Sequence, residues 1–155
     1  MHLYETHISV ANTTVAEKFY REIVGLRLAH RDLSRDIVFL WATSRDQAML
    51  GLWGPGTAYG PGNGSHFKQH LAFVVTLPEL FRATESLQRN GIETLGFWGG
   101  KASEPTVIGW MPSAQIYFRD PDEHVLEFIA ILGEEPDAGF NGPYSEWQKR
   151  RAGQS

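Results

Sequence analysis

The predicted elements of this chain occur twice in the same order, and this internal repeat limits the possible folds more than any other feature. Residues 3–11 alternate as a half-buried strand does, and an amphipathic helix that ends at Gly25 follows. Residues 68–75 again indicate a strand, followed by a second amphipathic helix that ends at Gly91. A capping box is predicted at the start of each helix: Thr14 with Glu17, and Thr76 with Glu79. The chain must therefore be built from two copies of one supersecondary unit.

Strand-like segments complete both copies. After the first helix they are residues 26–31, 37–42 and 48–53, and after the second they are residues 92–98, 113–119 and 124–131. Each copy therefore has the order βαβββ and one apolar sheet face to bury. We predict an α+β fold in which two paired βαβββ modules form a cup-shaped mixed sheet around a cavity.

Glycine and proline mark the boundary between the copies. Residues 54–64 hold five Gly and two Pro, which is typical of a connector and not of a helix or strand. The sequence thus predicts one domain over residues 1–132, with module one at 1–54, the connector at 55–67 and module two at 68–132. Residues 133–155 form a polar C-terminal tail, for which a short helix around 145–151 and a frayed end are the alternatives.

Composition excludes several kinds of site. The 155 residues include no Cys, so disulfides, thiolate catalysis and cysteine-ligated metals are ruled out. The net charge of -4 and the lack of a basic cluster argue against a nucleic-acid partner, and no apolar run is long enough for a membrane span. No signal peptide is evident, so a cytoplasmic location is expected. A metal site in this chain must use His, carboxylate or water, which suit Fe²⁺, Mn²⁺, Ni²⁺ or Zn²⁺.

One carboxylate in the last predicted strand needs a partner. Glu127 follows the turn signal Asp120-Pro121-Asp122 and is flanked on both sides by apolar residues. A carboxylate in such a run is costly to bury unless a metal, an Arg or a shared proton compensates it. Glu127 is therefore the first candidate for a functional group in this chain.

Two histidines extend this candidate to a site. His7 and His70 each lie in the first predicted strand of a copy, and we expect them to correspond to each other. A single strand histidine is more often a packed side chain than a ligand, but the repeat favours a ligand role for both. If the modules pair about a pseudo-twofold axis, His7, His70 and Glu127 can meet in the cavity. Two His and one carboxylate on one side of a metal leave other positions open for substrate.

These residues carry a resemblance to a known family. The matching motifs are Thr6-His7-Ile8-Ser9-Val10, Gln69-His70-Leu71-Ala72-Phe73-Val74 and Tyr117-x-x-Asp120-Pro121-Asp122-x-His124-x-x-Glu127. Over roughly residues 3–131 the chain resembles the vicinal oxygen chelate superfamily, which includes glyoxalase I, extradiol dioxygenases, fosfomycin-resistance enzymes and metal-free bleomycin-binding proteins. The resemblance implies paired βαβββ modules around a divalent metal, a small-molecule substrate and a homodimer.

Two branches of the superfamily differ from this chain at specific positions. Glyoxalase I resembles the pattern but takes a fourth ligand, a Glu, from the last strand of its first module, and that place corresponds to Gly51 here. Extradiol dioxygenases have a catecholate-binding Tyr that matches Tyr117. They also have a His shortly before this Tyr, which residues 108–115 lack, and usually Gly in place of Glu123.

The fosfomycin-resistance branch matches in part as well. It shares the three ligands, the Tyr and a hydroxyl residue two positions after the first His, which Ser9 matches. It also holds its phosphonate with an Arg soon after the ligand Glu, whereas no Arg follows Glu127 until Arg150. The resemblance thus gives Tyr117 and Ser9 as candidate catalytic residues. The structural alternatives are a strand tyrosine that packs with its hydroxyl at a wet edge and a serine that merely faces the cavity.

The sequence therefore predicts a divalent-metal-dependent enzyme that chelates a small substrate through vicinal oxygens, with a dioxygenase-like or glyoxalase-like activity. Its metal ligands would be His7, His70 and Glu127. The alternatives are a fosfomycin-resistance-type transferase or hydrolase, and a metal-free drug-binding or metabolite-binding protein of the bleomycin-resistance type.

Overall fold

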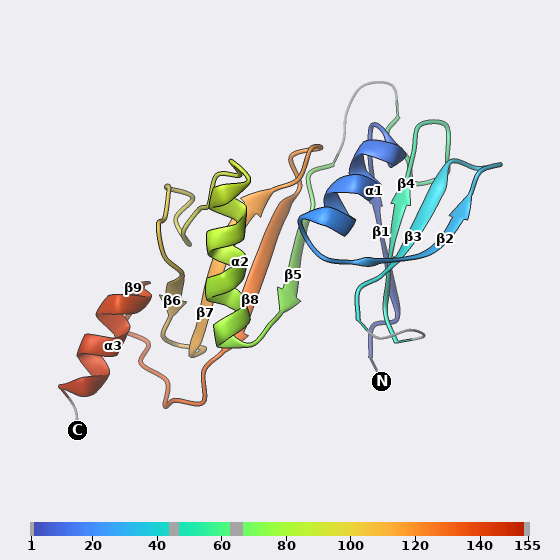
Figure 1. Cartoon of the computed structure of the whole chain (residues 1–155). Coiled ribbons are helices and arrows are strands. Elements are labelled where there is room, and N and C mark those ends of the chain that lie inside the picture. The colour runs from blue at the N-terminus through green and yellow to red at the C-terminus, as the bar shows by residue number, and fades with distance from the viewer. Residues whose placement is uncertain (1, 44–46, 63–66, 154–155) are drawn as a thin grey trace. The chain divides into compact units, whose positions relative to one another are not determined.

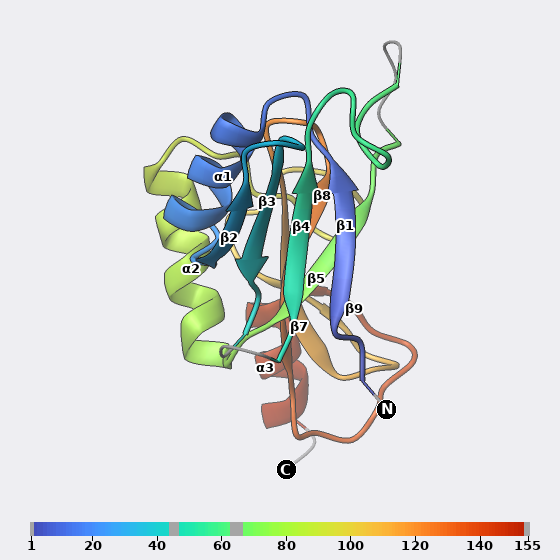
Figure 2. The same cartoon turned by 90° about the vertical axis from the view of Figure 1, so that its right-hand side faces the viewer.

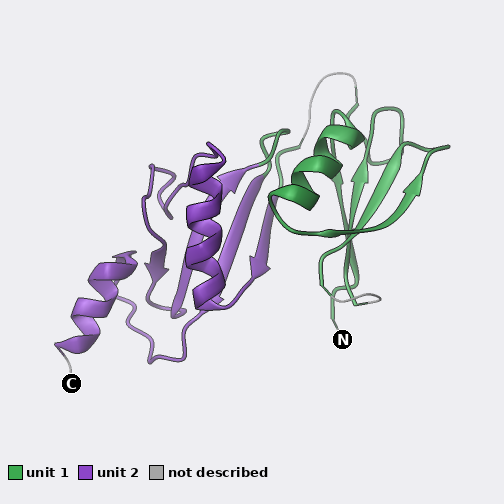
Figure 3. Ribbon diagram, viewed as in Figure 1, with its two compact units in different colours: residues 1–69, 120–124 green, residues 70–119, 125–155 purple. Residues whose placement is uncertain are grey.

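The computed structural model describes residues 2–43, 47–62 and 67–153. The chain divides into two compact units (Figure 3). Unit 1 comprises Met1–Gln69 and Asp120–His124, and unit 2 comprises His70–Arg119 and Val125–Ser155. Mixed sheets with few helices confirm the predicted α+β class. None of the described helices is both long enough and apolar enough to cross a membrane.

Unit 1 consists of a four-stranded sheet and one helix (Figures 1 and 2). Its elements are β1 (Glu5–Ser9), α1 (Thr13–Glu22), β2 (Arg27–Asp32), β3 (Ile37–Trp41) and β4 (Met49–Trp53). The strand order is β1-β4-β3-β2, with β1 and β4 parallel and the other neighbours antiparallel. The element order is therefore the predicted βαβββ.

Unit 2 repeats this plan and extends it. Its elements are β5 (His70–Val74), α2 (Leu77–Arg89), β6 (Thr106–Ile108), β7 (Ser113–Arg119), β8 (Val125–Ile131), β9 (Asn141–Pro143) and α3 (Tyr144–Ala152). The strand order is β5-β8-β7-β6-β9, and β5 and β8 are parallel as β1 and β4 are in unit 1. In Figure 1, α2 lies across β7 and β8.

Each sheet has one face for a core and one for a site. In unit 1 the alternation places Ile8, Leu50 and Leu52 on the face that packs against Ala16 and Tyr20 of α1, and all are buried. The opposite face, here called the site face of unit 1, carries Glu5, His7, Ser9, Phe39, Gly51 and Trp53. In unit 2 the site face carries His70, Ala72, Gln115, Tyr117, Glu127 and Ile129.

The two helices begin differently. The predicted capping box of α2 is confirmed, since the Glu79 carboxylate accepts a hydrogen bond from the Thr76 backbone N–H at 2.8 Å. The capping box predicted at Thr14 and Glu17 is wrong. Asn12 is the N-cap of α1, and its side-chain oxygen accepts from the Val15 N–H at 3.0 Å. Glu17 is instead buried beside arginines, and the hydrogen bond from Arg31 lowers its pKa.

The strand predicted at residues 92–98 is also wrong. Only Leu95 pairs there, exchanging both backbone hydrogen bonds with Tyr117, and the second strand of the copy is β6, later in the chain. The glycines that follow Leu95 explain the difference, because Gly99 has a φ of +78° and turns the backbone away from extended pairing.

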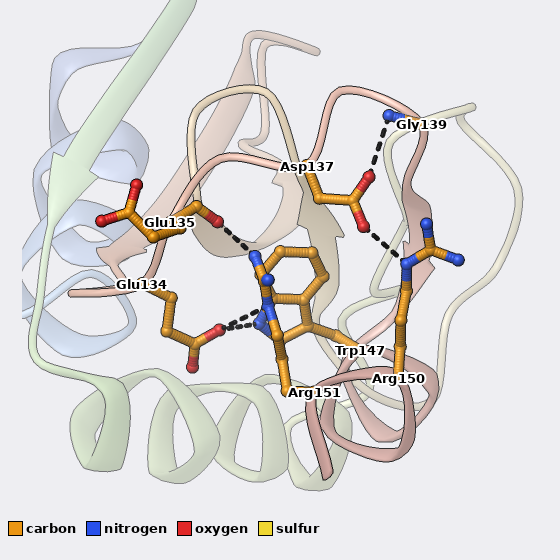
Figure 4. Close-up of polar contacts among 7 residues, drawn as sticks. All are labelled: Glu134, Glu135, Asp137, Gly139, Trp147, Arg150 and Arg151. Carbon is orange, nitrogen blue, oxygen red and sulfur yellow. Dashed lines mark hydrogen bonds and ion pairs between the residues drawn. The ribbon is translucent and has the colours of Figure 1, made fainter. Parts of the chain in front are cut away.

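The C-terminal residues up to 153 pack as part of unit 2 (Figure 4). The sheet extends through β9, which pairs with β6, and α3 then follows. Trp147 is fully buried, its indole N–H donates to the Glu134 carboxylate, and the Arg151 guanidinium lies 4.0 Å from its ring centroid. Arg150 forms an ion pair with Asp137 at 2.5 Å. Of the two sequence alternatives for this tail, the structure has the helix.

Candidate metal centre

In unit 1, two polar side chains converge on the site face. Glu5 and His7 are two residues apart on β1, so both side chains point to the same face. The His7 Nε2 and the Glu5 Oε1 are 2.7 Å apart, and the two side chains are 27% and 34% exposed. This pair offers one imidazole nitrogen and one carboxylate, both accessible to a ligand.

Gly51 makes room for this pair. It stands opposite His7 in the β1–β4 register, and a Cβ at Gly51 would lie 2.7 Å from the His7 Cδ2 and 3.3 Å from its Nε2. The Trp53 and Tyr59 rings lie 5.0 Å and 5.3 Å from the His7 ring. The imidazole therefore occupies space that a side chain at position 51 would take, and aromatic rings hold it there.

In unit 2, the site face holds a second pair of the same chemistry. His70 lies on β5 and Glu127 on the neighbouring β8, and the His70 Nε2 is 2.9 Å from the Glu127 Oε2. The Glu127 side chain is only 8% exposed, whereas that of His70 is 52% exposed. The buried carboxylate predicted from the apolar run is thus confirmed, and a histidine is its partner.

Tyr117 contacts the same carboxylate. It stands opposite Glu127 in the β7–β8 register. Burial, together with the negative charge of Glu127 and a hydrogen bond to it, raises the pKa of the Tyr117 hydroxyl. The hydroxyl therefore stays protonated at neutral pH and acts as a donor. Ser9 lies on the site face of unit 1, and its catalytic role stays a prediction.

The register of the two copies corrects one correspondence. The Val10 N–H bonds the Trp53 carbonyl at 3.0 Å, and the Val75 N–H bonds the Ile129 carbonyl at 2.9 Å, which makes these two pairs equivalent. Counting back two residues on the second strand of each pair aligns Gly51 with Glu127, as the sequence suggested.

Counting back five residues on the first strand aligns Glu5, and not His7, with His70. The sequence comparison matched the two histidines by residue type and so missed Glu5. A signal was present, because Glu5 precedes Val10 by the same spacing as His70 precedes Val75, and both valines lie just before a helix cap.

The Asp-Pro-Asp turn is a structural feature of unit 1. Asp120 is buried and accepts hydrogen bonds from the Tyr20 hydroxyl at 2.8 Å and from the His124 N–H at 2.8 Å. Burial raises the pKa of the Asp120 carboxyl. His124 is fully buried, its Nδ1 accepts from the Gln69 N–H, and its Nε2 lies 2.8 Å from the Ser9 carbonyl. Both ring nitrogens are thus engaged, which explains why this histidine packs and is not a ligand candidate.

The candidate metal-ligand side chains lie in two pairs, each made of one His and one Glu. Among the described residues, no group of three or more His, Asp or Glu side chains is arranged to hold a metal ion. Two ligands that lie about 2.1 Å from one ion at a right angle are about 3 Å apart. The Glu5–His7 and His70–Glu127 separations of 2.7 and 2.9 Å are ordinary hydrogen-bond distances that are also compatible with this geometry. The metal preference comes from the donor types, because imidazole with carboxylate suits Fe²⁺, Mn²⁺, Ni²⁺ or Zn²⁺. The donor set therefore fits a divalent metal.

Comparison with known families agrees with this architecture. The family model for the Glyoxalase/Bleomycin resistance protein/Dioxygenase superfamily matches residues 3–128. The chain belongs to this superfamily. The superfamily includes enzymes as well as members that are not enzymes. Comparison with curated protein sequences gives no match.

Solved structures show the same fold. An integron cassette protein from the mobile metagenome of the Halifax Harbour sewage outfall is 28% identical, with a TM-score of 0.69 over 84% of this chain and 98% of that one. Lactoylglutathione lyase from Agrobacterium tumefaciens is 20% identical, with a TM-score of 0.64 over 83% and 92%. The oxidase ChaP-H2 is 16% identical, with a TM-score of 0.67 over 87% and 97%.

Proposed function

We propose that this protein is a divalent-metal-dependent enzyme that chelates a small substrate through two adjacent oxygens. The observation that supports this most is the presence of a His–carboxylate pair on the site face of each unit, at 2.7 and 2.9 Å. The proposed ligands are His7, His70 and Glu127, as predicted from the sequence, with Glu5 added because it takes the place of His70 in unit 1. The proposal requires the two site faces to share one ion, either within a chain or between the chains of a homodimer.

The proposal gives His7 a specific place in the donor set. A glyoxalase-type fourth ligand would start at position 51, where this chain has no side chain. The His7 ring fills the space beside that position, so the imidazole replaces the missing carboxylate, while Glu5 takes the place of the first histidine. The set keeps two nitrogens and two carboxylates, with the donor types exchanged between positions in unit 1.

A set of four protein ligands favours a glyoxalase-like reaction over a dioxygenase-like one. With four protein ligands, a six-coordinate ion keeps two positions, which suffice for a chelating substrate and leave none for dioxygen beside it. A glyoxalase-like lyase or isomerase activity is therefore proposed first, and a dioxygenase-like activity second. When bound, the ion would act as a Lewis acid for negative charge that develops on a substrate oxygen.

The other proposed residues orient the metal ligands and contact the substrate. Tyr117 keeps its proton and donates to Glu127, which fixes the direction of this carboxylate. The same hydroxyl lies on the site face, where its oxygen can accept a hydrogen bond from a substrate hydroxyl. Ser9 is proposed to contact substrate on the unit 1 side. His7 and Glu5 orient each other through their contact at 2.7 Å.

A second candidate function is a metal-free binding protein for a drug or metabolite. A pocket of about 370 Å³ beside His7 favours it, since such a pocket can hold a small molecule without any metal.

Metal analysis of protein purified without added metal separates the two candidates. The enzyme proposal predicts close to one Fe, Mn, Ni or Zn per chain, lost on Glu127→Gln and retained in the control Glu85→Gln, an exposed carboxylate on α2. A metal content that is negligible, even after reconstitution with each ion, or equal in both variants would refute it.

A further inference from the structure

Unit 1 has a second cavity, between α1 and β2, that contains none of the candidate metal ligands. Its volume is about 530 Å³, within the range of about 300–1,000 Å³ that is usual for small-molecule sites. Most of its lining is charged, and these charged residues are Glu17, Lys18, Arg21, Glu22, Arg27 and Arg31. The cavity is therefore unlike the largely apolar pockets in which uncharged ligands bind.

Positive charge exceeds negative charge in this lining. Four of the lining side chains are cations and two are carboxylates, which leaves an excess of two positive charges in a chain whose net charge is -4. Lys18 and Arg27 form no ion pair with any residue that the structure describes. A concave surface with uncompensated positive charge concentrates anions, because its low-dielectric walls focus the field.

One buried carboxylate holds two of the arginines side by side. The Glu17 Oε1 accepts hydrogen bonds from the Arg21 Nη1 at 2.9 Å and from the Arg31 Nη2, and its Oε2 accepts from the Arg31 Nε at 2.7 Å. The Glu17 side chain is 9% exposed, whereas those of Arg21 and Arg31 are 46% and 44% exposed. One carboxylate neutralises only one guanidinium, and a guanidinium has more N–H donors than these contacts use. Donors therefore remain available to a ligand.

An irregularity in β2 turns Arg31 toward α1. Leu28 pairs with Leu40 and Arg31 pairs with Val38, and the register shifts between these two pairs. The two partners are two residues apart on β3, so Leu28 and Arg31 share a face although they are three residues apart. This is the face that packs against α1, because Val38 stands opposite Leu52. Bulges that redirect a side chain are common next to functional sites.

We propose that this cavity binds a diphosphate group, either as the free anion or as part of a small organic molecule. Guanidiniums bind phosphate oxygens through paired N–H donors, and an excess of two positive charges suits a polyvalent anion better than a single carboxylate. Lys18 is three residues before Arg21 on α1, so it lies beside the arginines and extends the cationic surface along the helix. Because the cavity and the candidate metal centre share no residue, this inference does not depend on the proposed metal chemistry.

The test is calorimetric titration of the full-length protein with pyrophosphate, before and after treatment with EDTA, because pyrophosphate can also bind to a metal. Arg21→Gln removes one guanidinium but leaves Glu17 paired with Arg31, so unit 1 should still fold. Lys18→Gln removes an unpaired cation. Arg89→Gln is the matched control, because Arg89 is exposed on α2, does not line this cavity and changes the net charge equally.

Pyrophosphate should bind equally before and after EDTA treatment. Its affinity should fall about tenfold in Arg21→Gln and about threefold in Lys18→Gln, with Arg89→Gln unchanged. Titration with ADP distinguishes the two sources: tighter binding than that of pyrophosphate supports the proposal with an organic diphosphate, and weaker binding supports it with the free anion.

Four results would overturn the proposal. They are the absence of pyrophosphate binding, an unchanged affinity in both lining variants, an equal loss of affinity in Arg89→Gln, and binding that EDTA treatment abolishes. The last would place the anion on a metal and not in this cavity. Acetate serves as the monovalent anion, and binding as tight as that of pyrophosphate would contradict a site for a polyvalent phosphate.

Discussion

The two units have the same βαβββ frame but assemble a His–carboxylate pair in different ways. In unit 2, His70 and Glu127 come from two neighbouring strands, β5 and β8. In unit 1, both members of the pair, Glu5 and His7, come from β1, and the position equivalent to Glu127 is Gly51. In unit 1 the position without a side chain, Gly51, thus has the His7 ring in the space beside it.

The difference shows that the two units present the same two side-chain types from different strands. A Cβ at Gly51 would overlap the His7 ring, so a carboxylate at 51 and an imidazole at 7 exclude each other in the present geometry. The two pairs also differ in solvation, since Glu127 is 8% exposed and Glu5 is 34% exposed. Charge interactions are stronger in the less solvated pair, so changes in unit 2 should have the larger effects.

The largest effect is expected in the C-terminal extension, β9 and α3, which unit 2 has and unit 1 lacks. Trp147 is fully buried, so Trp147→Ala should lower the free energy of unfolding by about 3–5 kcal/mol. Chemical denaturation measures this loss, and Trp98→Ala, at a ring that is 81% exposed, is the control. If Trp147→Ala lost no more stability than Trp98→Ala, α3 would not be an integral part of unit 2.

The second-largest effect is expected in the less solvated pair, His70 and Glu127. Glu127→Gln keeps the size of the side chain but removes its charge, and metal affinity should fall by about 100-fold or more. Competition titration with a metal indicator measures the affinity. Glu85→Gln on α2 serves as control and should bind as the unchanged protein does.

The overlap between a Cβ at Gly51 and the His7 ring gives a third test. Gly51→Ala should destabilise the protein by about 1–3 kcal/mol, because the new Cβ meets the His7 ring at 2.7 Å. The double variant with His7→Ala should recover most of this loss. Gly62→Ala is the control, since no atom lies within 4 Å of a Cβ there. Equal losses in the single and double Gly51 variants would remove His7 from the explanation.

The smallest net effect should come from making unit 1 resemble unit 2. In the double variant His7→Ala with Gly51→Glu, the donor moves from β1 to β4, where the equivalent residue of unit 2 is Glu127. Metal affinity should return to within about tenfold of the unchanged protein, well above that of His7→Ala alone. No recovery would mean that position 51 cannot supply a donor.

Much of the fold could be predicted from the sequence because the repeat and the helix stops are local patterns. The α2 capping box, the equivalence of Gly51 with Glu127 and the burial of Glu127 all follow from spacing and apolar neighbours. The Thr14–Glu17 box failed because Asn12 caps the helix and Arg31, from strand β2, binds Glu17. Such long-range competition has no local signal.

The candidate site was only partly predictable for a similar reason. Residue type favoured His7 over Glu5, whereas the strand register, which depends on backbone pairing with β4, aligned Glu5 with His70. The space that Gly51 leaves for His7 also requires the paired strands to be known. The strand predicted at 92–98 failed because glycines beyond Leu95 redirect the chain, so that β6 forms later.

The central claim is that both pairs hold one ion, and the most direct test is calorimetric titration of Zn²⁺ into metal-free protein and two unit 1 variants. The unchanged protein should bind one ion per chain, and Glu5→Gln and His7→Ala should each weaken binding by about tenfold or more. Unchanged affinity in both variants would contradict the account, because the site would then need unit 2 alone.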